Sequence, residues 1–152
     1  MNRSGIYRKG ELNFNVVLED VRNSAEFGKA GGIAVFIGVV RGRSSDGHRV
    51  VKLEVDSYEE KAESALSRIC SELAMREGIV DLRIYHIVGE FGPGDDLVYV
   101  VVAGAHRKEI LGVLREAVEK YKHEAPFFKK EYLIKNESGE TVTRWVEEFS
   151  LE

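Results

Sequence analysis

The sequence LVYVVVAGAHRKEILGVLREAVEKYKHEAPFFKKEYLI, residues 97–134, changes its hydrophobic period twice. Residues 97–103 are apolar at odd and even positions, which is typical of a strand with both faces buried. From about His106 to Glu124 the apolar residues recur at helical spacing. Pro126 disfavours helical backbone at Ala125, so the helix is expected to end there. Its predicted core face consists of Ile110, Leu111, Leu114, Ala117, Val118 and Tyr121.

Three strands and a short helix are predicted on the amino-terminal side. Residues 31–40, GGIAVFIGVV, are apolar at both parities and bounded by glycines, which predicts a buried central strand. Residues 49–57 alternate and predict a second strand. Residues 12–17 predict a short strand, and residues 18–27 a short helix. The predicted inward face of strand 49–57 is Val51, Leu53 and Val55.

A second long helix follows Tyr58 and is expected to end near Gly78. Residues 80–88 predict a strand, and residues 128–134 and 142–147 predict a terminal hairpin. The helical period after Tyr58 is carried by Ala62, Ala65, Leu66, Ile69, Cys70 and Leu73.

The predicted order of elements is β-α-β-β-α-β-β-α-β-β. Helices interspersed with strand pairs that look antiparallel indicate an α+β fold with two-layer packing. The length of 152 residues fits one domain, residues 1–152, with a hydrophobic core.

The composition excludes several classes of protein. The net charge of −4 and the pI of about 5.7 argue against bulk nucleic-acid binding. The longest apolar run, residues 33–40, is too short to span a bilayer. The amino terminus has no apolar segment of the secretory type, and one cysteine forms no intramolecular disulfide. We therefore predict a cytoplasmic protein.

Cationic side chains follow both strongly apolar strands. Arg41 comes directly after residues 31–40, while His106 and Arg107 open the long helix. A helix amino terminus binds phosphate through free N–H groups, and arginine suits bidentate phosphate binding. The alternative is an ordinary first helical turn with solvated polar residues. The pattern favours an anion-binding pocket of Arg41, His106, Arg107 and a lysine or two.

Three lysines near the end of this helix are further candidates. Lys122 borders the apolar face, where a lysine either snorkels to solvent or becomes partly desolvated and available for acid–base or nucleophilic work. Lys129 and Lys130 are adjacent on a predicted strand and therefore point to opposite faces. At most one of these two shares a face with a given pocket.

Cys70 lies on the predicted core face of its helix, where a thiol is usually inert. No combination of His, Cys, Asp or Glu has convincing metal-ligand spacing, and no nucleotide-binding glycine motif is present. We therefore predict no metal and no cofactor.

Six segments together resemble a known family. They are FIGVVRG (36–42), VDSYEEKAE (55–63), HIVGEFGPGDD (86–96), AGAHRKE (103–109), YKHEAPFFKKEY (121–132) and RWVE (144–147). In this order they resemble the large, catalytic subunit of molybdopterin synthase, over about residues 30–148. The resemblance implies an α/β hammerhead-type fold with a mostly antiparallel sheet and a C-terminal hairpin.

The resemblance also implies an activity and partners. Members form a homodimer, and each large subunit binds a small, ubiquitin-like sulfur carrier, which gives a heterotetramer. The carrier's C-terminal Gly-Gly thiocarboxylate enters a pocket on the large subunit. Sulfur passes from it to cyclic pyranopterin monophosphate and yields molybdopterin for molybdenum or tungsten cofactor biosynthesis.

The two catalytic lysines of the family align with Lys122 and Lys129, so the resemblance implies that these two residues are catalytic. The substrate-binding positions that it implies are Arg41, His106, Arg107, Lys130, Glu131 and Phe36.

Two other classes of function remain open on the sequence. One is a non-catalytic module that binds a phosphate ligand in the same pocket. The other is an interaction protein that docks a ubiquitin-like partner without chemistry.

Overall fold

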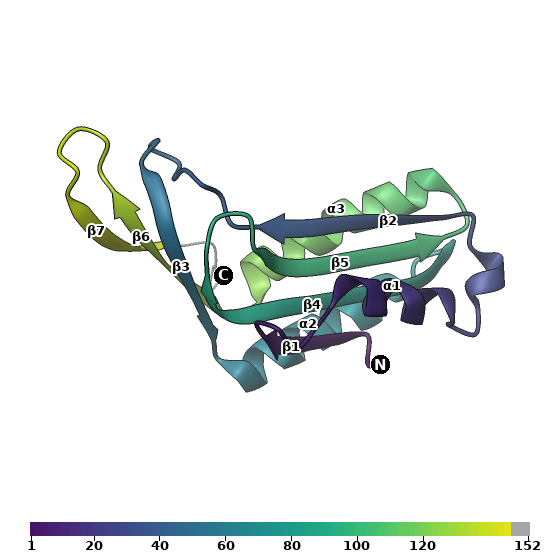
Figure 1. Ribbon diagram of the computed structural model, residues 1–152. Helices are drawn as coiled ribbons and strands as arrows, with labels where there is room; N and C mark the ends of the chain where they lie inside the picture. Colours follow the sequence, from purple (N-terminus) through teal and green to yellow (C-terminus); the bar gives the residue numbers. More distant parts are fainter. Residues whose placement is uncertain (147–152) are drawn as a thin grey trace.

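The computed structural model describes residues 1–146, and its strands form one seven-stranded sheet with helices on both faces (Figure 1). The elements are β1 Ser4–Arg8, α1 Phe14–Arg22, the short 3-10 helix η1 Phe27–Lys29, β2 Gly32–Val39, β3 Arg49–Ser57, α2 Glu59–Ala74, β4 Ile79–Phe91, β5 Asp96–Gly104, α3 Arg107–Glu124, β6 Phe127–Ile134 and β7 Thr141–Val146.

The strand order is β2-β5-β4-β3-β6-β7, and β1 pairs with β4 in parallel while every other pair is antiparallel. The α+β class, the mostly antiparallel sheet and the C-terminal hairpin of β6 and β7 are thereby confirmed. The predicted order of helices and strands is also the observed order.

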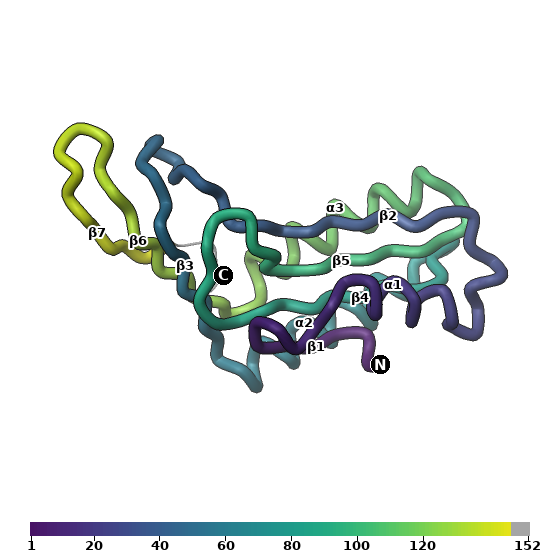
Figure 2. The backbone as a smooth tube through the Cα atoms, in the orientation of Figure 1, coloured from purple at the N-terminus to yellow at the C-terminus, as the bar shows by residue number. Residues whose placement is uncertain are grey.

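The long strand β4 joins two parts of the sheet. Its first part pairs with β5 and β1, and its last residues, 89–91, pair with β3. Gly89, with φ 132°, stands at the change of partner, in a region of backbone space that favours glycine. Figures 1 and 2 show β3, β6 and β7 as an arm that crosses the rest of the sheet at an angle.

The core face of α2 is confirmed at all six predicted positions, which are buried in the core, and the helix packs on β1, β4 and α3. Strand β5 is buried along nearly its whole length, as its two-sided apolar pattern predicts. Helix α3 ends at Glu124, and the backbone is already extended at Ala125, before Pro126. The predicted core face of α3 is wrong in two details: it includes Leu111, which is 57% exposed, and it omits Val113, which is buried.

The predictions for the amino-terminal region are wrong in position. Residues 12–17 do not form a strand, because helix α1 already begins at Phe14 and ends at Arg22, not Phe27. Asn13 caps this helix, and its side chain accepts a hydrogen bond of 2.8 Å from the Asn15 N–H. The first strand lies earlier in the chain, at Ser4–Arg8.

Strand β2 is an edge strand and not a central one. It pairs only with β5, and Val35, Ile37 and Val39 are 36–48% exposed on one face. Strand β3 contains a register shift between Val50 and Lys52, which turns Val50 inward and leaves Val51 exposed. The predicted inward position of Val51 is therefore wrong, whereas Leu53 and Val55 are buried as expected.

A buried ionic cluster fixes the amino-terminal segment to β4. Arg83 and Asp81, both on β4, form an ion pair of 2.9 Å, and Arg83 also contacts Asp20 on α1. The Tyr85 hydroxyl donates to the Asn2 carbonyl oxygen. These contacts hold α1 and the residues before β1 against β4, at a distance from the pocket described below.

None of the helices within residues 1–146 is long and apolar enough to cross a membrane.

Gly31 provides a test of the close packing at the start of β2. A Cβ at Gly31 would lie 2.3 Å from the carbonyl oxygen of Ala105, whereas a Cβ at Gly28 meets nothing within 4 Å. We expect Gly31→Ala to lower the free energy of unfolding by about 1–3 kcal/mol or more because the backbone must shift. Gly28→Ala should change it by less than about 1 kcal/mol. Urea unfolding of both variants checks this, and equal stabilities would contradict the packing.

Candidate functional site: a cationic pocket at the junction of the sheet

A pocket of about 420 Å³ lies where the end of β2, the loop after it, the end of α3 and the start of β6 meet. Its lining includes Phe36, Arg41, Lys122, Lys129 and Glu131, which are five of the eight residues assigned from the sequence. The wall is otherwise largely apolar. Among the described lining residues, Glu131 is the one carboxylate beside four cations.

Two neighbouring elements present the lysines. Lys122 lies in the last turn of α3, and the extended backbone at Ala125 reverses the chain into β6. Lys129 then lies on β6, opposite Val55 of β3 and Val146 of β7. The corner at Ala125 and Pro126 therefore places the two lysines in one pocket from elements that are adjacent in the chain.

The imidazole of His86 lies beneath this corner. It is fully buried and stacks on Phe127, with the ring centroids 3.8 Å apart, and its edge meets Tyr121. Its Nδ1 lies 3.0 Å from the Ile87 carbonyl oxygen, so this nitrogen carries the proton when the ring is neutral. Burial, followed by the charges of Lys129 and Lys122, lowers the pKa of His86 to about 3.

Lys130 and Glu131 point in opposite directions from β6. Glu131 lines the pocket, and its carboxylate accepts a hydrogen bond of 3.3 Å from Arg144 Nε. The Lys130 ammonium lies 5.7 Å from the ring centre of Trp145 and is not among the lining residues. Of the two adjacent lysines, Lys129 is the one that shares a face with the pocket.

His106 and Arg107 lie far from this pocket within the chain. Strands β2 and β5 are antiparallel, so Arg41, which follows β2, and His106, which follows β5, lie at opposite ends of this strand pair. Helix α3 has 18 residues and separates Arg107 from Lys122 by roughly 22 Å along its axis. The structure therefore does not bring Arg41, His106, Arg107 and the lysines together in one pocket of one chain.

The sequence analysis missed three polar lining residues, Arg43, Ser44 and Ser45. They follow Arg41 in the stretch RGRSS, and a second arginine two residues after the first was the available signal. Within the described part of the chain, Arg43 adds a fourth cation to the pocket.

Cys70 is buried, and desolvation raises the pKa of its thiol to about 12. It is therefore a neutral thiol in the core at neutral pH and not a nucleophile. Residues 1–146 contain no group of three or more His, Cys, Asp or Glu side chains that could hold a metal ion.

The fold and the pocket define an α+β protein with a pocket rich in lysine and arginine. The sequence profile described as MoaE protein matches residues 9–124, about three quarters of the chain. The chain belongs to this family, and the family resemblance found in the sequence is confirmed.

Individual relatives agree with this assignment. A molybdopterin synthase catalytic subunit from Ralstonia nicotianae is 33% identical over 140 residues, which cover 92% of this chain and 76% of the relative. A probable molybdopterin synthase from Haloferax volcanii is 39% identical over 103 residues, 67% of this chain. The match spans only 40% of that longer protein.

Solved structures share the fold. Molybdopterin synthase from Staphylococcus aureus has a TM-score of 0.78 and 26% identity, and the alignment covers 96% of this chain and 98% of that one. A complex of subunits 1 and 2 of molybdopterin-converting factor from Helicobacter pylori aligns with a TM-score of 0.69 at 23% identity, over 93% of this chain and 89% of that one.

The pKa of His86 leads to a test by pH. The folded protein keeps this imidazole neutral down to about pH 3, whereas the unfolded chain binds a proton near pH 6.5. Acid therefore favours the unfolded chain, and the stability is lost as pH falls below 6.5. When the pH falls from 7 to 5, the free energy of unfolding of the native protein should decrease by about 2 kcal/mol more than that of the His86→Phe variant.

Urea unfolding at the two pH values measures this difference. His123→Ala, which removes an exposed histidine from α3, is the matched control. Identical pH dependence in the native protein and His86→Phe would show that His86 is not buried as a neutral ring.

Proposed function

We propose that this chain is the catalytic subunit of a molybdopterin synthase. In this proposal it converts cyclic pyranopterin monophosphate to molybdopterin, with sulfur from the C-terminal thiocarboxylate of a small ubiquitin-like carrier subunit. The observation that carries the proposal is the convergence of Lys122 and Lys129, from α3 and β6, in one pocket with Arg41. Family membership and the names of the relatives support it.

The charge of the pocket suits this chemistry. The substrate phosphate and the carrier's thiocarboxylate are both anions, and they must approach each other for sulfur to move. Arg41, Arg43, Lys122 and Lys129 reduce that repulsion in a site with largely apolar walls, where electrostatic interactions are stronger than in water.

The two lysines have separate proposed tasks. Lys129 activates the thiocarboxylate or stabilises the oxyanion formed at its carbonyl carbon. Lys122 acts as a general acid and base on the pterin side chain, during opening of the cyclic phosphate and loss of water. Phe36 and Glu131 contact the substrate from the pocket wall, and Lys130 extends the binding site beyond it.

The state of Cys70 supports an external source of sulfur. A sulfurtransferase that carried its own persulfide would need an accessible, activated thiol. The thiol of Cys70 is buried and has a raised pKa. Sulfur that arrives on a partner's carboxyl terminus removes that requirement, and we place this reaction in the cytoplasm.

Substitution of the lysines tests the proposal. We expect Lys122→Ala and Lys129→Ala each to lower kcat by about 100-fold or more, because each removes a group that acts on the reacting atoms. Turnover is measured with thiocarboxylated carrier and cyclic pyranopterin monophosphate. Lys120→Ala is the matched control on the same helix, because Lys120 does not line the pocket and its ammonium lies 4.0 Å from Glu72 of α2.

Near-native rates for both variants would contradict the catalytic assignment. A non-catalytic phosphate-binding module would bind the phosphate ligand without any sulfur transfer in the native protein. A docking protein without chemistry would bind the carrier but show no turnover.

The position of His106 and Arg107 is explained if the chain forms the homodimer that the family resemblance implies. Both side chains are exposed at the end of α3 opposite Lys122, so they serve a pocket only if that pocket belongs to a second copy of the chain. We propose that each of the two active sites takes its lysines from one protomer and its His-Arg pair from the other.

Mixing two inactive variants tests this arrangement. A dimer of one His106→Ala chain and one Lys122→Ala chain retains one intact site if sites are shared between protomers. When the subunits of an equal mixture exchange at random, half of the dimers are mixed, and each mixed dimer has one intact site of two. The mixture should therefore show about a quarter of the native activity. No recovery, with exchange verified by differently tagged chains, would show that the two residues do not serve a shared site.

A further inference from the structure

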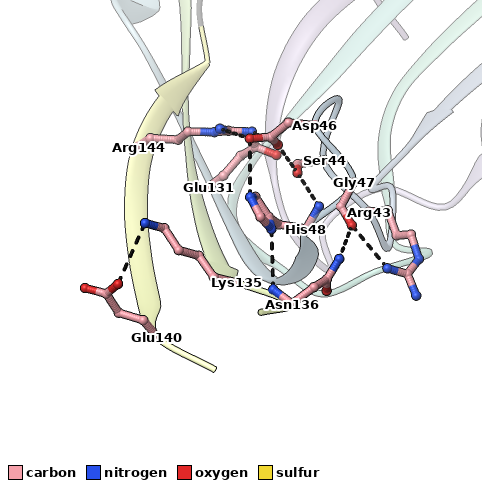
Figure 3. Close-up of polar contacts among 10 residues, drawn as sticks. All are labelled: Arg43, Ser44, Asp46, Gly47, His48, Glu131, Lys135, Asn136, Glu140 and Arg144. Atoms are coloured by element: carbon pink, nitrogen blue, oxygen red, sulfur yellow. Dashed lines mark hydrogen bonds and ion pairs between the residues drawn. The ribbon is translucent and has the colours of Figure 1, made fainter. Parts of the chain in front are cut away.

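The loop between β2 and β3, residues 40–48, brings Arg41 and Arg43 to the pocket. Its tip lies beside the hairpin of β6 and β7 (Figures 2 and 3). The loop joins the edge strand β2 to the arm of the sheet. Its start is fixed by backbone hydrogen bonds on both sides of Arg41, from Val40 N–H to Asp95 and from Val50 N–H to Gly42, both at 2.9 Å, whereas its tip contacts the hairpin.

The loop is folded on itself by short polar contacts. Ser44 N–H donates to the His48 carbonyl oxygen at 2.8 Å, and His48 N–H donates to Ser44 Oγ at 3.0 Å. Arg43 Nη1 donates to the Gly47 carbonyl oxygen at 3.1 Å. These contacts tie Arg43 to the tip of the loop, so a contact at the tip acts on Arg43 directly.

Arg144 of β7 holds that tip. Its two terminal nitrogens contact the two carboxylate oxygens of Asp46 at 2.9 and 2.7 Å, a bidentate arrangement (Figure 3). The contact lowers the pKa of Asp46 well below its ordinary value. Asn136 adds a neutral contact, because its side-chain nitrogen donates to the Gly47 carbonyl oxygen at 2.8 Å.

The same guanidinium also reaches the pocket. Arg144 Nε lies 3.3 Å from Glu131 Oε1, and Glu131 is only 15% exposed. An unpaired Glu131 would repel an anionic substrate, and its pairing with Arg144 offsets that charge. His48 is the other titratable group near Asp46, with Nε2 3.6 Å from Oδ2.

We propose that Arg144 is a positioning residue for the anion-binding side of the pocket. It clamps Asp46, and with it the loop tip to which Arg43 is bonded, against the hairpin, while it neutralises Glu131. The predicted effect on turnover rests on the proposed function. The contact between Arg144 and Asp46 does not depend on any activity and can be tested separately. Arg144 acts through other residues and touches no reacting atom.

The effect on turnover is measured with Asp46→Asn, Arg144→Gln and the double variant. Each single variant should raise KM for cyclic pyranopterin monophosphate roughly tenfold, since the loop and the charge of Glu131 are then no longer held in place beside the pocket. For Asp46→Asn, kcat and the affinity for the carrier should stay within about twofold of native. The double variant should be no worse than Arg144→Gln because the two residues act through one contact.

The position of the loop is measured independently by limited digestion with trypsin, without carrier or substrate. Cleavage after Arg43 should be roughly tenfold faster in Asp46→Asn and Arg144→Gln than in the native protein, because the loop tip must open for the chain to be cut there. Lys135→Gln is the matched control, since it breaks an exposed contact with Glu140 in the same hairpin, away from the pocket. It should leave KM and loop cleavage unchanged.

Native KM and native cleavage rates in Asp46→Asn would overturn the inference. So would a loss of kcat with unchanged KM, which indicates a general structural defect. If the native protein itself shows no synthase turnover, the proposed function fails, and the cleavage rates alone decide whether Arg144 holds the loop.

Discussion

The stack of His86 on Phe127 joins the centre of the sheet to the corner between α3 and β6. Tyr121 immediately precedes Lys122, and Phe127 lies two residues before Lys129, so both lysines depend on aromatic residues that contact one buried ring. A charged imidazole at this position would repel both ammonium groups. The pKa of His86, lowered to about 3, keeps the ring neutral wherever the protein is folded near neutral pH.

Around this neutral centre the protein concentrates positive charge, although the whole chain carries a net charge of −4. The lysines come from the corner, and the two arginines come from a loop whose tip is held by Arg144. The single described carboxylate of the lining, Glu131, is paired with the same arginine. The site is thus basic because of where a few residues lie and not because of composition.

Sequence reasoning succeeded where the signal is local. Six apolar positions at helical spacing gave the buried face of α2, and Pro126 gave the end of α3. The Asn13 cap of α1 was also a local signal, and it was overlooked in favour of a strand. Among the candidate site residues, Lys122 and Lys129 share the pocket because the corner between them is encoded within eight residues.

The failures concern relations between distant segments. An apolar run does not reveal how many neighbours a strand has, so β2 was placed at the centre of the sheet instead of its edge. Residue patterns also do not give the relative direction of β2 and β5, and their antiparallel pairing separates Arg41 from His106. The contact between Asp46 and Arg144 joins residues 98 positions apart, for which a single sequence carries no signal.

The central claim is that this pocket transfers sulfur that the chain itself never carries. Reconstitution of Cys70→Ala with thiocarboxylated carrier and cyclic pyranopterin monophosphate, followed by measurement of dithiolene formation, tests it most directly. The account predicts product at the native rate and none when the carrier ends in an ordinary carboxylate. Loss of product in a folded Cys70→Ala protein, or sulfur transfer without the thiocarboxylated carrier, would contradict it.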